Sequence, residues 1–514
     1  MQPLSFERVE IDGVPAYVGN NDGPVVAGLT FRTGVADETP RDRGITSLVA
    51  ELAAIDVDNV EFEVGMTATS FVARGNANDV TQALTAVCDA LPAFADDELR
   101  QLGDTILDEW PQPPTLRTML LTLRFGAHDH GVAALPPLGL LRVEGDDARA
   151  WANRVFTRGN AALWSTGPLA ASVSLPLPAG DRIPPLPRAD SECATPAWCP
   201  NVWLGAMFHD AVDATLVASM SDATLVTMRA LEDELVERLH DTPLRGTKPE
   251  IHLARWADDL GYVMLSLDTV ASGNDGVEAL LGSLDDFSEL GPDPDELTAA
   301  TNAIWRWSTE RGNAEDVAEM LAADELRTGR PRLLDAFLDS VDKVSGEDVQ
   351  HVFAELRESI MLAVPADADI VAPEFTLLDR SSAVVVDGKK YRRTQATGTP
   401  VDDARLIVGA DGVSYASDDQ QLAVYFEDCV AVVAYPDHSI ALYDVDGTDI
   451  EFSAAEWRDG GQAYESVVAA APPDTLLVAR RSLGTGMAAA AGGEATDPDA
   501  VETVEGDAAD EVQI

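Results

Sequence analysis

Lysine is scarce in this sequence: only four of its 514 residues are Lys, against 31 Arg. The 35 basic side chains face 89 acidic ones, which gives a net charge of −54. A charge of this sign repels phosphates, so it argues against nucleic acid or an acidic membrane surface as a partner. A carboxylate-rich surface with little Lys favours adaptation to concentrated salt, as in a halophilic archaeon, where the Debye length is about 3 Å. An acidic protein that binds a basic partner is the alternative.

Cysteine and long apolar runs are scarce as well. Cys88 and Cys429 lie in apolar periodic segments and are expected in the core. Cys193 and Cys199 do not have a zinc spacing, and either a local disulfide or two free thiols fits them. No apolar run reaches the roughly 18 residues of a membrane span, and the N-terminus has no signal-peptide pattern. We therefore expect a cytoplasmic protein.

Composition divides the chain into five parts. Apolar residues make up 46% of it, which is enough for a large core and excludes a wholly disordered protein. A Pro-rich stretch, a change to short strand-like runs and a tail rich in Ala, Gly, Asp and Glu mark the boundaries. The predicted parts are a first lobe (1–180), a linker (181–200), a second lobe (201–370), a small β domain (375–481) and an acidic disordered tail (482–514).

Two patterns recur about 200 residues apart. An Asp-Glu-Leu motif at Asp97 recurs at Asp295, 198 residues later. A helix-like run that begins at Asp147 and leads into an apolar strand recurs at Asp348, 201 residues later. The two offsets predict that the lobes are duplicates of each other. Chance is the alternative, because acidic residues often begin helices.

Within each lobe, short apolar strands alternate with amphipathic helices. This alternation predicts an α+β fold in which helices cover a mixed sheet. The predicted strands are Val25–Arg32, Thr67–Arg74, Val202–Phe208 and Tyr262–Asp268, and the predicted helices are Gly44–Ala54, Asn78–Leu91, Leu225–Leu239 and Val277–Phe287.

The small domain differs from the lobes in its pattern of elements. Eight short β-type runs separated by turns lie between Ala383 and Phe452, and Ala454–Val468 reads as a closing helix. This order predicts a small antiparallel barrel with a C-terminal helix, which resembles pleckstrin-homology-like modules in topology. Its basic cluster, Lys389–Arg393, either discourages pairing at a sheet edge or docks an acidic partner.

The run from Phe31 to Leu52 reads FRTGVADETPRDRGITSLVAEL. It resembles the opening of the insulinase/pitrilysin-type zinc metallopeptidases, which include mitochondrial processing peptidase. In that family a small-residue turn and an acidic loop lead to Gly-Leu/Ile and then to an HxxEH helix. Glu98–Trp110 resembles the family's third helix, which carries a zinc-ligand Glu. Weaker matches continue to about residue 370, so the resemblance implies two α/β lobes that form a clam-shaped shell.

The zinc motif is where this sequence departs from the family. Ser47 and Glu51 stand at the two His positions, Ala50 stands at the general-base Glu, and only Glu109 keeps the type of its ligand position. Hydrolytic zinc needs three protein ligands, an open water position and a base. The resemblance therefore implies four vestigial positions, no catalytic residue and no cofactor. A hard cation such as Mg²⁺ or Ca²⁺ between Glu51 and Glu109 is the alternative.

Other candidate residues are less specific. The family's second lobe holds the bound peptide with an Arg and a Tyr; Arg238 or Arg245 could stand in for the Arg, and no Tyr follows at the expected place. His128 and His130 are spaced like ligands on a strand, but a structural or surface pair fits their turn-like context better.

Three functions follow from these observations. The preferred one is a catalytically inactive insulinase-like chain that binds an extended peptide or assembles with a protein partner, such as an active homologue. The second is a zinc-dependent metallopeptidase with relocated ligands. The third is a docking adaptor that acts through the C-terminal barrel, which should then be separable from the two lobes.

Overall fold

The computed structural model describes residues 4–110, 116–184, 202–206, 210–255, 260–270, 272–365, 368, 375–378, 382, 384–394, 403–417 and 420–482. Cys193, Cys199 and the acidic tail beyond Ser482 lie outside the described residues. Cys88 and Cys429 are buried, as predicted, and burial raises the pKa of each thiol to about 12. No helix in the described ranges is long and apolar enough to cross a membrane.

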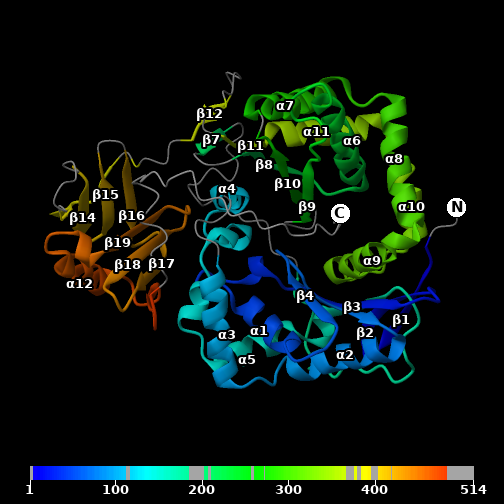
Figure 1. Cartoon of the computed structure of the whole chain (residues 1–514), viewed down its shortest axis with the longest axis horizontal. Helices are drawn as coiled ribbons and strands as arrows, with labels where there is room; N and C mark the ends of the chain where they lie inside the picture. Colours follow the sequence, from blue (N-terminus) through cyan, green and yellow to red (C-terminus); the bar gives the residue numbers. More distant parts are fainter. Residues whose placement is uncertain are drawn as a thin grey trace, which may run out of the picture.

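The first lobe contains a six-stranded mixed sheet in the order β1-β2-β6-β3-β5-β4 (Figure 1). Strand β6 runs parallel to β2, and the other neighbouring strands are antiparallel. Helices α1, α2, α3 and α5 pack below the sheet in Figure 1. The bounds are β1 Phe6–Ile11, β2 Val14–Gly19, β3 Val25–Phe31, α1 Ile45–Ala54, β4 Val60–Val64, β5 Thr69–Gly75, α2 Ala77–Ala90, α3 Asp96–Glu109, α4 Leu116–Phe125, α5 Gly145–Val155 and β6 Ala161–Ser165.

The second lobe repeats this arrangement of strands. Its sheet has the order β12-β7-β11-β8-β10-β9, with β11 parallel to β7 and antiparallel to β8. As in the first sheet, the last two pairs, β8–β10 and β10–β9, are antiparallel. The two sheets differ at the other end, where the short β12 pairs with β7 in parallel. The bounds are β7 Val202–Ala206, β8 Ala211–Ser219, α6 Asp222–Leu239, β9 Glu250–Arg255, β10 Leu260–Asp268, α7 Gly273–Leu290, α8 Pro294–Thr309, α9 Ala314–Thr328, α10 Leu334–Val341, α11 Gly346–Glu358, β11 Met361–Pro365 and β12 Thr376–Leu377.

Each lobe covers the inner face of the other lobe's sheet with one helix. Helix α9 of the second lobe packs on β2, β3 and β6, where its Leu321 shares a core with Tyr17 and Trp164. Helix α4 of the first lobe packs on β8 and β11, and its Leu120 shares a core with Met361. The lobes are therefore joined by two exchanged helices, in addition to the connecting chain.

The C-terminal unit corrects one prediction. In place of a closed barrel, the described residues form two four-stranded sheets, β13-β14-β15-β16 and β19-β18-β17-β20, with α12 packed on a shared apolar core. Strand β20 pairs with β17 in parallel and so occupies the edge that β16 would need to close a barrel. The bounds are β13 Gly388–Arg392, β14 Arg405–Gly409, β15 Gly412–Ala416, β16 Gln421–Tyr425, β17 Cys429–Ala434, β18 Ser439–Asp444, β19 Asp449–Ser453, α12 Gly460–Ala470 and β20 Leu476–Val478.

One sheet of the C-terminal unit is buried on both faces. Val432 and Leu442 point into the unit's own core, whereas Val433, Tyr443 and Leu477 belong to the apolar core of the first lobe. All six residues of β18 are buried. Deleting the unit would therefore uncover apolar surface of the first lobe, which disagrees with the predicted separability of this part.

Candidate functional site

The glycine and the acidic loop ahead of α1 have defined structural roles. Gly44 adopts φ +97°, and a Cβ there would meet Pro137 Cβ at 2.6 Å, so only glycine fits. The fully buried Glu38 carboxylate accepts hydrogen bonds from the Gly44 and Thr46 amides, each at 2.8 Å. Arg43 donates to the same carboxylate at 3.2 Å. This negative charge at the helix N-terminus satisfies two free amides and fixes the start of α1.

The structure brings two of the four zinc-motif positions together. Ser47 and Glu51 are half-buried and lie one turn apart on α1. Glu109 is the last residue of α3, which packs against α1. The pKa of Glu51 is raised, first because the carboxyl is partly buried and second because the negative charge of Glu109 lies near it. Glu51 and Glu109 therefore approach each other in the way that the resemblance implies.

The residues at these positions do not fit zinc. Ala50 is fully buried in the core of the first lobe and offers a methyl group where an active peptidase needs a base. Ser47 offers a neutral hydroxyl, and zinc in proteins is held mainly by imidazole, thiolate and carboxylate groups. Within the described residues, no group of three His, Cys, Asp or Glu side chains is placed to hold a metal ion. Binding of Mg²⁺ or Ca²⁺ between the carboxylates of Glu51 and Glu109 stays a prediction.

The two Arg residues proposed for peptide binding are placed differently from each other. Arg238 near the end of α6 forms ion pairs with Glu234, at 2.5 Å, and with Asp286 of α7. Arg245 is exposed in the following turn. Neither belongs to the described lining of the cavity between the lobes, so their role in peptide binding stays a prediction.

A cavity of about 680 Å³ lies between the lobes. On one side it is lined by Glu63 of β4 and the turn that follows, and on the other side by β9 from His252 to Arg255. Helix α9 forms a further wall with Glu319 and Met320. Both β4 and β9 are the last strands of their sheets, so two sheet edges that carry no further strand in the described ranges flank the cavity. We refer to this cavity as the chamber.

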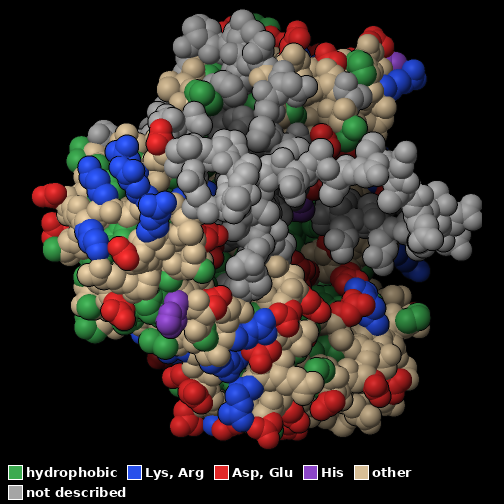
Figure 2. Space-filling view, turned by 60° about the vertical axis from the view of Figure 1, so that its left-hand side comes forward, with side chains coloured by type: hydrophobic (Ala, Val, Ile, Leu, Met, Phe, Trp, Pro, Cys, Tyr) green, Lys and Arg blue, Asp and Glu red, His purple; other side chains and the backbone are tan. Residues whose placement is uncertain are grey.

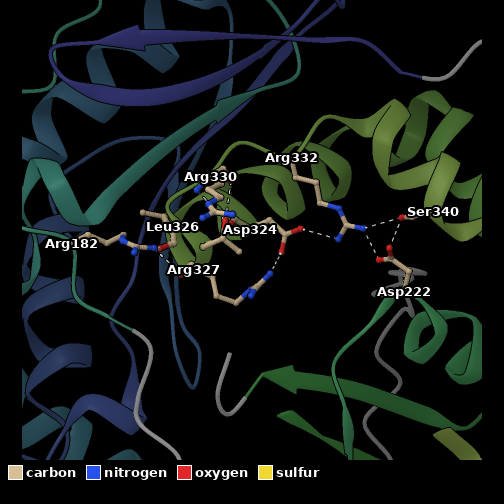
Figure 3. Close-up of polar contacts among 9 residues, drawn as sticks. Arg182, Asp222, Asp324, Leu326, Arg327, Arg330, Arg332 and Ser340 are labelled. Atoms are coloured by element: carbon tan, nitrogen blue, oxygen red, sulfur yellow. Dashed lines mark hydrogen bonds and ion pairs between the residues drawn. The ribbon is translucent and has the colours of Figure 1, made fainter. Parts of the chain in front are cut away.

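One corner of the chamber is rich in arginine. Arg327 donates to Asp324 at 3.1 Å, and Arg332 bridges Asp324, at 3.2 Å, and Asp222, at 2.5 Å (Figure 3). Arg255 of β9 lines the same chamber. Burial and repulsion by Arg327 lower the pKa of Arg255 to about 10.

Sequence reasoning missed this corner, although one signal was available. The segment from Arg327 to Arg332 reads RTGRPR, which places three Arg in six residues of a strongly acidic chain. Arg255 and Asp222 gave no such signal, because only the tertiary fold brings β9 and the start of α6 to this point.

His130 has a structural role at the junction of the lobes. It is fully buried, and its Nδ1 lies 2.9 Å from the hydroxyl of Tyr262 in the second lobe. Burial lowers the pKa of His130 to about 4. His128 contacts the neighbouring Asp129. The arrangement fits the structural interpretation of this pair better than a metal site.

We expect His130 to make stability depend on pH. The unfolded state binds its proton near pH 6.5 and the folded state only near pH 4, so the folded state loses stability as the pH falls between these values. The loss should reach about 2–3 kcal/mol at pH 4.5. Denaturant unfolding at pH 7 and pH 4.5 should show this loss in the wild type and a smaller one in His130→Asn, which keeps a polar group but does not titrate. Equal losses in both proteins would contradict this assignment.

Comparisons with known proteins show the fold of the two lobes. No protein-family model and no curated protein matches the chain. Among solved structures, Complex III2 from Candida albicans with Inz-5 bound has a TM-score of 0.55 at 12% identity, covering 70% of this chain and 96% of that one. A chain described as an M16-like peptidase from Alicyclobacillus acidocaldarius has 0.54 at 14%, covering 71% and 99%. The peptidase M16 inactive domain from Pseudomonas fluorescens has 0.56 at 14%, again covering 71% and 99%. At these identities the likeness shows an insulinase-like (M16) fold and nothing more about function.

Proposed function

We propose that this chain is a non-catalytic protein of insulinase-like fold that binds an extended polypeptide segment in the chamber. The observation that carries the proposal is that β4 and β9 flank the chamber and are the end strands of their sheets among the described residues. The resemblance, which places Ala50 at the position of the catalytic base, supports a role without catalysis. A peptide in extended conformation adds to a free edge through backbone hydrogen bonds, which need no particular side chain. The occurrence of an inactive M16 domain among the similar structures supports a role without catalysis.

Hydrogen exchange tests this proposal. An extended peptide of β-branched residues, added in excess, should slow amide exchange in β4 or β9, because its backbone would cover one of these edges. The strand β13 is the internal control, since it is the end strand of its sheet among the described residues and does not belong to the described lining of the chamber. Unchanged exchange in both β4 and β9 at saturating peptide would overturn the proposal.

The partner version of the proposal needs a separate experiment. We propose that the polypeptide held by this chain belongs to a partner, such as a homologue that keeps HxxEH. Such a chain should then copurify with this protein in concentrated salt. A protein that stays monomeric and captures no such chain would leave peptide binding as the role.

The adaptor alternative rests on the basic edge of the C-terminal unit. Lys389, Lys390 and Arg392 are exposed on β13, and Figure 2 shows basic side chains gathered on this unit while acidic ones spread over the rest of the visible surface. The edge position of β13 equally suits a strand that is protected against edge pairing. We favour peptide binding in the chamber over the adaptor role, because the other sheet of the C-terminal unit packs against the first lobe.

A further inference from the structure

The arginine corner of the chamber holds more positive than negative charge. Among the described residues, three guanidinium groups, of Arg255, Arg327 and Arg332, share two carboxylates, of Asp222 and Asp324, which leaves one positive charge in excess there. Asp324 and Arg327 are mostly buried, with side chains 11% and 19% exposed. The whole chain has 35 basic and 89 acidic residues, so an excess of positive charge in this cavity is the opposite of the overall composition.

Two of these guanidinium groups have hydrogen-bond donors to spare. Arg255 lines the chamber, and its guanidinium makes no hydrogen bond to another described residue, although its backbone pairs with Gly261 of β10. The buried Nε of Arg327 likewise has no acceptor there. Figure 3 shows Arg332 extended between its two aspartates, so its charge is already shared. A buried donor without an acceptor costs roughly 1–3 kcal/mol, so an incoming acceptor at this corner would be favoured.

The rest of the chamber does not cancel this charge. Burial raises the pKa of Glu319 on the α9 wall, which favours its neutral form, and Ser70 donates a hydrogen bond to it at 2.9 Å. Arg32, which also lines the chamber, is paired with Asp37 at 2.8 Å. Glu63 lies on the opposite side, at the edge strand β4. The excess positive charge is thus confined to the corner formed by β9 and the end of α9.

We propose that the corner formed by Arg255, Arg327 and Arg332 binds a carboxylate, so that the chamber selects peptides carrying an Asp or Glu side chain. Guanidinium groups bind carboxylates through paired N–H donors, and such charge-assisted bonds are about twice as strong as neutral ones. The inference rests on the proposed function, since it names the class of peptide that the chamber takes. Arg255 lies on β9 itself, so a peptide added along that edge would place its side chains beside this guanidinium.

Two matched peptides test this selectivity. One is a fluorescein-labelled β-branched peptide with a single central Glu, and the other has Gln at that position. Fluorescence anisotropy in concentrated KCl, which screens the repulsion between the acidic chain and the acidic peptide, should show the Glu peptide binding at least about tenfold more tightly. Arg255→Gln should weaken binding of the Glu peptide and remove the difference between the two peptides, because it removes a guanidinium of the proposed carboxylate site.

Arg330→Gln is the control variant, because Arg330 belongs to the same run of arginines but is exposed and does not line the chamber. It should keep the preference for Glu. Equal binding of both peptides by the wild type, or an unchanged preference in Arg255→Gln, would overturn the carboxylate site while peptide binding stands. Failure of both peptides to bind would overturn the proposed function itself.

Discussion

Replacing Arg124 by alanine is expected to lower the free energy of unfolding by about 5 kcal/mol. Arg124 on α4 is almost completely buried and reaches from the first lobe into the sheet of the second. Its Nε donates to Thr215 Oγ1 at 3.0 Å, and its Nη2 donates to the carbonyl oxygens of Thr215 and Ser359 at 2.8 and 2.7 Å. Removing the guanidinium breaks these three buried hydrogen bonds and also opens a cavity at the junction of the lobes.

Graded variants separate the causes of this loss. Arg124→Lys keeps the charge but cannot donate in three directions from a planar group, so it should lose about half as much. Arg100→Ala is the matched control: Arg100 is 52% exposed, and Asp97 is its one ion-pair partner in the part of the chain that the structure describes, so the loss should stay within about 0.5 kcal/mol. Denaturant unfolding followed by circular dichroism measures all three. A loss below about 1 kcal/mol for Arg124→Ala would show that the lobes do not depend on this contact.

Introducing two histidines at the degenerate motif should create a zinc site there. In Ser47→His/Glu51→His the imidazoles would lie one helical turn apart on α1, the spacing at which two His bind one metal. Glu109 would supply the third ligand, since its charge already acts on the Glu51 position. We expect about one equivalent of zinc in the double variant after dialysis and less than about 0.1 in the wild type. Ala50 is unchanged, so the variant should bind zinc without gaining a base for hydrolysis.

Adding Glu109→Gln to the double variant is the control. It removes the third charged ligand while keeping the shape of the side chain, so the zinc content should fall well below one equivalent. Stoichiometric zinc in the wild type would instead support relocated ligands, and elemental analysis by mass spectrometry distinguishes these results.

The sequence predicted the lobes better than it predicted their contacts. Strands and helices with clear periodicity were confirmed within a few residues; Gly44–Ala54, for example, became α1 at Ile45–Ala54. The central strand β8 was missed, because Ala211–Ser219 mixes Asp and Thr with apolar residues and shows no simple alternation. The predicted strand Ala383–Val386 does not form one in its described residues, and the pairing begins later, at Gly388.

The C-terminal unit shows why topology is harder to predict than elements. The run from Ala431 to Tyr435 is apolar at every position, which is typical of a strand buried on both faces. A small barrel would bury only one face of this strand, whereas in the structure both faces are buried. Leu476–Val478 is too short to be recognised as a strand, yet its pairing with β17 is what replaces the closed barrel by two sheets.

The two parts of the candidate site differ in how far the sequence indicates them. The positions Ser47, Ala50, Glu51 and Glu109 came from the resemblance to the insulinase-type motif, and their role stays a prediction; the first three lie on α1 and Glu109 on α3. The chamber and its arginines come from β4, β9 and α9, which are distant in the sequence, so no local pattern could place them together. Arg238 and Arg245 came from the resemblance to the family's second lobe, and the structure gives them no part in the described lining of the chamber.

Incubating the wild-type protein with a labelled extended peptide and added zinc tests the central claim most directly. Anisotropy reports binding, and mass spectrometry of the same sample reports whether the peptide is intact. The account predicts a peptide that is bound and remains whole, with or without a chelator. Peptide fragments that appear with zinc and disappear with the chelator would contradict it.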